Sequence, residues 1–107
     1  MIKVENIEEV YDAVRKEKLV LIEAGSESCG PCMAIREKLS DWLEDHKEIK
    51  GFYVSIEEFP EIAGREGKFS APAVILYAEG KQTVRETGCF SLEAVLDKVL
   101  RYEKLMK

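Results

Sequence analysis

The chain has 107 residues, enough for one hydrophobic core but not two, so we expect a single domain over residues 1–107. Its net charge of −5, without a cluster of basic residues, argues against nucleic acid as a partner. No stretch approaches the roughly 20 apolar residues of a membrane-spanning helix. The amino-terminal residues lack the charged-then-apolar pattern of a signal peptide, so we expect a cytoplasmic protein with no membrane partner.

The first half of the chain alternates short strands with amphipathic helices. Alternation over residues 2–5 predicts an edge strand, and Asn6 starts a helix through a capping box with Glu9. The apolar, β-branched run 19–24 predicts a strand buried on both faces. Apolar residues at spacings of three and four then predict a long helix that runs to about Lys47. The order in this half is therefore β-α-β-α.

The second half of the chain adds strands, a short helix and a final long helix. Residues 52–56 alternate as a strand, and a short helix follows Pro60. Residues 73–78 and 84–87 predict two strands joined by a hairpin turn, and Ser91 caps the last helix. The whole order predicts an α/β fold, a three-layer α/β/α sandwich. Ligand sites in such sheets lie beyond the carboxyl ends of the central strands.

Two cysteines, Cys29 and Cys32, lie where the predicted central strand gives way to the long helix. Pro31 suits the first turn of that helix, because its missing N–H is not needed there. The unpaired N–H groups and the dipole at a helix start favour a thiolate over a thiol, and the thiolate is the reactive form of cysteine. The pattern predicts thiol–disulfide exchange, with Cys29 as the attacking thiol and Cys32 as the resolving thiol.

A pair of cysteines two residues apart also occurs in zinc sites and in structural bridges. Zinc requires four ligands, and only His46 and Cys89 remain besides carboxylates, at no recognisable spacing. We therefore expect no metal and no other cofactor. Three cysteines, an odd number, do not make a disulfide framework. The residues favour redox chemistry over both alternatives.

The motif Cys29-Gly30-Pro31-Cys32 is identical to the active-site motif of the thioredoxin family, which the chain resembles over nearly its whole length. Glu23 stands at the position of the family's buried acid, usually Asp. Ala71-Pro72 stand where the family has its cis-proline, and Gly88 matches a glycine that lines the substrate groove. The resemblance implies a thioredoxin fold with a mixed five-stranded sheet, in the order 1-3-2-4-5, and two helices on each face.

The resemblance also implies a function and its partners. It implies a monomeric protein-disulfide reductase that acts on disulfide-containing client proteins and is recycled by a flavoprotein of the thioredoxin reductase type. Burial would raise the pKa of Glu23 and make it a candidate proton shuttle for Cys32. The alternative is that the strand geometry lets Glu23 reach solvent. The residues expected to contact clients are Gly30, Pro31, Ala71, Pro72, Gly88 and Cys89.

The sequence departs from the family pattern beside the motif. Ser28 replaces the usual tryptophan, Gly25-Ser26 replace a bulky aromatic stretch, and Met33 stands where a lysine is common. Glu27 adds negative charge. Lost aromatic surface and lost positive charge suggest weaker or different recognition of clients and reductase, and the missing tryptophan favours a specialised redox partner or sensor with a single client. A second alternative is a non-enzymatic binding module that uses the same groove, and the intact dithiol argues against it.

The third cysteine, Cys89, lies just before the Ser91 cap in a short loop that the resemblance places beside the groove. It is either a small, semi-buried residue that fills the loop or an accessible thiol open to oxidation. In both cases we expect no bridge from Cys89 to Cys29 or Cys32, because the loop holds it beyond the roughly 7 Å that separates the Cα atoms of bridged cysteines.

Overall fold

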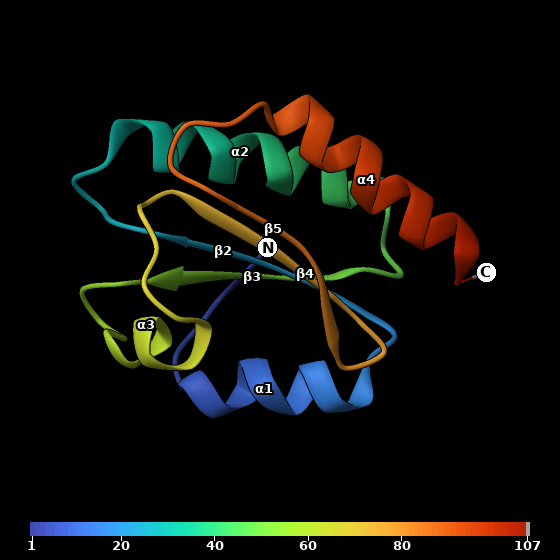
Figure 1. Cartoon of the computed structure of the whole chain (residues 1–107), viewed down its shortest axis with the longest axis horizontal. Helices are drawn as coiled ribbons and strands as arrows, with labels where there is room; N and C mark the ends of the chain where they lie inside the picture. The colour runs from blue at the N-terminus through green and yellow to red at the C-terminus, as the bar shows by residue number, and fades with distance from the viewer. Residues whose placement is uncertain (107) are drawn as a thin grey trace.

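A computed structural model describes residues 1–106 and contains the expected sandwich. Figure 1 shows the sheet between α2 and α4 on one face and α1 and α3 on the other. The elements of residues 1–106 are, in chain order, β1 (Ile2–Lys3), α1 (Ile7–Lys16), β2 (Leu19–Gly25), α2 (Gly30–Glu44), β3 (Lys50–Ser55), α3 (Glu61–Glu66), β4 (Ala73–Ala78), β5 (Lys81–Thr87) and α4 (Leu92–Leu105). None of the helices in this range has the length and apolar character that a membrane crossing requires.

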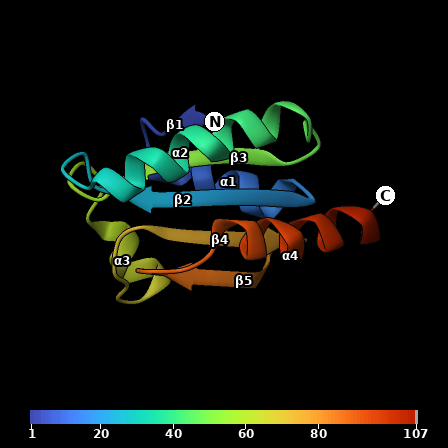
Figure 2. The same cartoon turned by 90° about the horizontal axis from the view of Figure 1, so that it is seen from above.

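The strands are ordered β1-β3-β2-β4-β5, which confirms the predicted topology. β2 pairs in parallel with β3 and in antiparallel with β4, and every residue of β2 is buried. Ala24 near the end of β2 lies opposite Ala73, and Ala73 lies opposite Thr87. The segments after β2, before β4 and after β5 therefore meet at one end of the sheet. Figure 2 shows α2 starting at that end.

The core has two layers because alternate residues of the central strands point to opposite faces. Val20 and Ile22 pack in the cluster that includes residues of α1, while Leu19 and Leu21 pack in the cluster that includes residues of α2 and α4. β2 contributes fully buried aliphatic side chains to both layers, which accounts for its near-continuous apolar run.

Several predicted boundaries differ from the structure: the strands predicted over 2–5 and 52–56 are Ile2–Lys3 and Lys50–Ser55, and two larger differences have a clear cause. The long helix ends at Glu44 rather than near Lys47, because the backbone tightens into a turn in which the N–H of His46 donates to Leu43 O at 3.0 Å. The His46 ring stacks on Trp42, with ring centroids 3.7 Å apart, and its Nδ1 lies 2.7 Å from an oxygen of Glu103 on α4. These contacts fix the chain where the helix stops.

The other boundary is the start of β5, which begins at Lys81 instead of residue 84. Glu79 and Gly80 both have positive φ, the conformation of a tight two-residue hairpin turn. Such a turn lets Lys81 pair with Ala78 at once, so the strand starts without a longer loop.

A buried glutamate, Glu66, links α3 to α1, β4 and β5 through hydrogen bonds. Its carboxylate accepts hydrogen bonds from the hydroxyls of Tyr11 at 2.6 Å and Tyr77 at 2.7 Å, and from Gln82 Nε2 at 2.8 Å. These donors come from α1, β4 and β5. Three hydrogen-bond donors compensate for the burial of this carboxylate. Glu66 therefore fixes the end of α3 and the start of the loop that leads to Pro72.

Replacing Glu66 with alanine should lower the free energy of unfolding by about 2–4 kcal/mol, because it leaves the hydroxyls of the buried Tyr11 and the partly buried Tyr77 without their acceptor. Urea denaturation followed by circular dichroism measures this. The matched control is Glu61→Ala, an exposed glutamate on the same helix, which should change stability by less than about 0.5 kcal/mol. Equal losses in the two variants would show that the Glu66 network does not stabilise the fold.

Candidate active site

Cys29 and Cys32 lie at the start of α2, just beyond the carboxyl end of β2 (Figure 2). A disulfide joins them, with their Cα atoms 5.3 Å apart. Cys29 is the N-cap of α2, and its sulfur accepts a hydrogen bond from the backbone N–H of Cys32 at 3.2 Å. Pro31 occupies the first turn, as predicted.

The two sulfurs are in different environments. Cys32 is fully buried, whereas Cys29 is partly exposed. When the disulfide is opened, the N–H groups and dipole at the start of α2 favour the thiolate form of Cys29. The arrangement therefore presents one accessible sulfur with a stabilised anionic form and keeps the second sulfur behind it.

Gly25 is a site residue whose role the sequence did not reveal. A Cβ added to it would lie 2.8 Å from Cys32 Cβ and 3.0 Å from Cys32 Sγ, closer than real contacts allow. Any side chain here would push Cys32 away from β2. A glycine at the end of an otherwise apolar strand can indicate such a close approach. The comparison with the family pattern noted only that an aromatic residue is missing at this position.

Glu23 lies on the same face of β2 as Leu19 and Leu21, which pack toward α2 and α4. Its side chain is fully buried, so the alternative in which Glu23 reaches solvent is wrong. Within residues 1–106 neither carboxylate oxygen has a hydrogen-bond partner. Burial raises the pKa of the Glu23 carboxyl to about 8, and the positive charge of Arg36 opposes that rise. A carboxyl with this pKa exchanges protons close to neutral pH.

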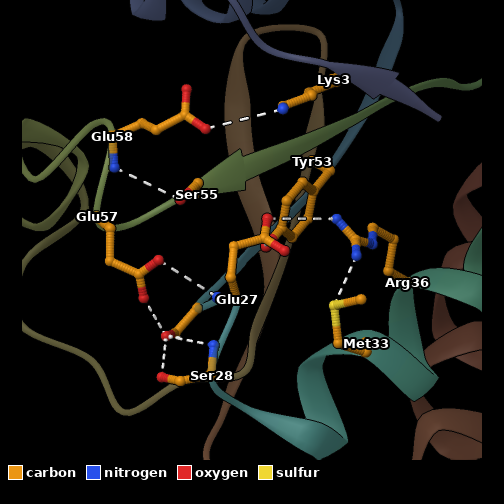
Figure 3. A network of polar contacts seen from close by, with 10 residues as sticks. Lys3, Glu27, Ser28, Met33, Arg36, Tyr53, Ser55, Glu57 and Glu58 are labelled. Atoms are coloured by element: carbon orange, nitrogen blue, oxygen red, sulfur yellow. Dashed lines mark hydrogen bonds and ion pairs between the residues drawn. The ribbon is translucent and has the colours of Figure 1, made fainter.

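Tyr53 and Arg36 complete the surroundings of Glu23, and the sequence analysis missed both. Tyr53 lies opposite Glu23 in the β2–β3 register, and the guanidinium carbon of Arg36 lies 4.1 Å from the centre of the Tyr53 ring. Arg36 also pairs with Glu27 at 3.7 Å, and the Tyr53 hydroxyl donates to Glu27 at 3.3 Å (Figure 3). Arg36 follows Cys32 by four residues, a spacing that places both on one helix face and could have indicated its proximity.

The loop before β4 lies at the same end of the sheet. The peptide bond between Ala71 and Pro72 is cis, and Pro72 is buried. Gly88, with a φ of 75°, donates its backbone N–H to Ser70 O at 3.0 Å and to Pro72 O at 2.8 Å. The segment after β5 therefore holds the proline loop, and the glycine is needed for the backbone conformation that allows both bonds.

Arg85 and Cys89 lie on either side of Gly88. The Arg85 guanidinium donates to the backbone carbonyls of Glu66 and Lys68 and so anchors the far end of the proline loop. Cys89 is exposed and is a free cysteine among the residues that the structure describes. Its thiol is therefore accessible, in line with the second of the two interpretations.

Metal-ligating side chains do not gather anywhere in the described part of the chain. Within residues 1–106 no group of three or more histidine, cysteine, aspartate or glutamate side chains is placed to hold a metal ion.

The sequence matches the profile of the family described as "Thioredoxin" over residues 2–101. It is 28% identical to Thioredoxin-2 of Pyricularia oryzae over 78% of this chain and 48% of that protein, so the chain spans about half the length of that relative. It is 29% identical to Thioredoxin-1 of Schizosaccharomyces pombe, over 75% of this chain and 78% of the relative.

Among solved structures, a mutant thioredoxin from Halobacterium salinarum has the same fold, with a TM-score of 0.82 and 22% identity over 95% of this chain and 89% of the other. Together with the Cys29–Cys32 disulfide at the start of α2, the family match shows that the chain belongs to the thioredoxin family of thiol–disulfide oxidoreductases.

Proposed function

We propose that this protein reduces disulfides in client proteins through the Cys29/Cys32 dithiol. The observation that supports this most directly is the contrast between the two cysteines, one partly exposed at a helix N-terminus and the other fully buried. In the first step the Cys29 thiolate attacks a client disulfide. A bond forms between Cys29 Sγ and one client sulfur, and the second client sulfur leaves as a thiolate.

In the second step Cys32 resolves the mixed disulfide. Its thiol loses a proton to the Glu23 carboxylate, and the resulting thiolate attacks Cys29 Sγ. The bond between Cys29 and the client breaks, the Cys29–Cys32 bond forms, and the client leaves as a second thiolate. Two electrons have then passed from the dithiol to the client, and protonated Glu23 returns its proton to water or to the client thiolate.

The client-binding surface in this proposal consists of the segments that meet at one end of the sheet. Ala24 pairs with Ala73, and Ala73 pairs with Thr87. This register brings the proline loop and the segment after β5 to the end of the sheet where α2 begins. An extended client segment can pair with backbone groups of such a loop. The proposed contact residues are Gly30, Pro31, Ala71, Pro72, Gly88 and Cys89.

A dedicated redox partner or sensor with one client is the second candidate, and the polar surface beside Cys29 favours it. Ser26 and Ser28 share a hydrogen bond of 2.8 Å, and the Ser26 hydroxyl also bonds to Glu57. Hydroxyl and carboxylate groups here offer less apolar contact to a general client than aromatic side chains would. A binding module without redox turnover is the third candidate.

The free, exposed Cys89 is compatible with a reducing compartment, so we place the protein in the cytoplasm. There we propose that a flavoprotein of the thioredoxin reductase type recycles it, and that it acts as a monomer.

An insulin reduction assay, driven first by dithiothreitol and then by a thioredoxin reductase with its reductant, tests the proposal. If the protein is a general disulfide reductase, it should reduce insulin with both electron sources. Turnover with dithiothreitol alone favours the dedicated partner, and absence of turnover with either favours the binding module.

The two motif cysteines should respond differently to serine. Cys29→Ser should abolish insulin reduction, whereas Cys32→Ser should accumulate a mixed disulfide with the client, because attack still occurs and release does not. Mass spectrometry of the trapped protein measures both outcomes. Adducts that form on Cys29→Ser and not on Cys32→Ser would reverse the assigned roles.

Glu23→Gln should slow resolution by about 10- to 100-fold and leave attack by Cys29 nearly unchanged, because only the resolving thiol needs this base. The deficit should be largest below the Glu23 pKa of about 8 and should shrink at higher pH, where the Cys32 thiol ionises without help. Stopped-flow kinetics across this pH range measure the two steps separately. An equal deficit in both steps would remove Glu23 from the proton-transfer role.

The same substitution should also change stability with a defined sign. The folded-state pKa of about 8 lies above the usual 4.5, so the wild type loses stability as pH rises from the lower value to the higher one. Glu23→Gln removes that loss. The variant should match the wild type near pH 5 and exceed it by roughly 2 kcal/mol or more at pH 9 in urea denaturation. A variant that is less stable at pH 9 would mean that the carboxylate is paired when ionised.

A further inference from the structure

Arg36 lies one helical turn beyond Cys32 and is held in place by three different contacts. Its guanidinium carbon lies 4.1 Å from the centre of the Tyr53 ring, and Nη1 lies 3.7 Å from Glu27 Oε1. Its Nη2 donates to the sulfur of Met33, one turn earlier on α2. Figure 3 shows the guanidinium between the Tyr53 ring, the Glu27 carboxylate and the Met33 sulfur. The guanidinium therefore has a fixed position, although the side chain is 25% exposed.

This position connects the protein surface to the buried carboxyl. Tyr53 is 2% exposed and lies opposite Glu23 in the strand register, so its ring forms part of the wall between Glu23 and solvent. Tyr53 also lies beside Gly25, the residue that contacts Cys32. Arg36 covers the outer face of this wall. Its charge lies over the buried site, and it carries no hydrogen bond to Glu23 in the structure described for residues 1–106.

The titratable and charged groups around Glu23 come from three directions. α2 contributes Arg36 and the disulfide-bonded Cys32, β3 contributes Tyr53, and the segment before α2 contributes Glu27. β4 places the apolar Val74 opposite Glu23. Burial and the negative charge of Glu27 raise the pKa of Tyr53 to about 12, so its hydroxyl stays neutral near pH 8. Arg36 is thus the cation whose charge lowers the pKa of Glu23 against the effect of burial.

We propose that Arg36 is a positioning residue of the active site: its guanidinium, fixed over the Tyr53 ring, places a positive charge beside the buried Glu23 carboxyl. This inference rests on the proposed function for its kinetic consequence, because only ionised Glu23 can take the proton of Cys32. A planar guanidinium suits the face of an aromatic ring, so arginine places its charge here more firmly than lysine would.

The test compares Arg36→Gln and Arg36→Lys with the parent protein, all carrying Cys89→Ser so that only the dithiol reacts. The first readout is the titration midpoint of the Glu23 side-chain carboxyl, followed by carbon-13 NMR in the oxidised protein. Arg36→Gln should raise this midpoint by about half a pH unit or more, since a nearby positive charge is lost. Arg36→Lys keeps the charge and should lie between the parent and Arg36→Gln. The matched control is Arg101→Gln, an exposed arginine on α4 with the same charge change, which should leave the midpoint in place.

The second readout is the resolving step, observed in a single turnover of the reduced protein with 5,5′-dithiobis(2-nitrobenzoate). The first released thiolate reports attack by Cys29, and the second reports resolution. Arg36→Gln should slow the second release about threefold or more at pH 7 and should match the parent near pH 10, because a higher midpoint leaves less ionised Glu23 at neutral pH. In a Glu23→Gln background the same substitution should have no further effect.

The two readouts separate the possible failures. If the titration midpoint of Glu23 is unchanged in Arg36→Gln, just as in Arg101→Gln, the inference is overturned whatever the kinetics show. A midpoint that rises without slowing the second release supports the action of Arg36 on Glu23 and contradicts Glu23 as the base. A rate loss that is equal at pH 7 and pH 10 would mean that Arg36 acts on the packing of α2, which also overturns the inference.

Discussion

Glu23 lies in the middle of the central strand, fully buried, and within residues 1–106 its carboxylate oxygens have no hydrogen-bond partner. An ionised carboxylate in such a place is costly, so the protein holds this group near the balance between its neutral and charged forms. Glu66, on the other side of the sheet, shows the contrast. Its carboxylate is satisfied by two tyrosine hydroxyls and an amide, and it joins elements of the fold. The unsatisfied glutamate lies behind the dithiol, and the satisfied one stabilises the fold.

The sheet positions the remaining parts of the site around the Glu23 carboxyl. β2 carries Glu23 and ends at Gly25, whose missing side chain lets Cys32 pack against the strand. The helix that follows places Cys29 at its N-terminus and Arg36 over the Tyr53 ring. The antiparallel strands on the other side deliver the proline loop to the same end. Gly25, Cys29 and the proline loop lie where elements start or end, so the site depends on strand register more than on any single loop.

Much of this could be predicted from the sequence, for identifiable reasons. The fold follows from the order of apolar patterns, and the dithiol from a motif at a strand-to-helix junction. Glu23 was predicted because it stands at the position of the family's buried acid, in a strand that is otherwise apolar. Tyr53 was missed because its contact with Arg36 joins β3 to α2, and local spacing does not reveal a pairing between distant elements. The four-residue spacing from Cys32 could have indicated Arg36 alone. The end of α2 was placed too late because the contact of His46 with Glu103 on α4 is likewise tertiary.

Infrared difference spectroscopy of wild type against Glu23→Gln tests the central claim most directly, because a protonated carboxylic acid has a carbonyl band that an ionised carboxylate lacks. A pKa of about 8 predicts that the Glu23 acid band dominates at pH 7 and disappears as the pH rises past about 9. An acid band that is already lost at pH 5.5 would contradict the account, because Glu23 would then have the pKa of an ordinary, solvated glutamate.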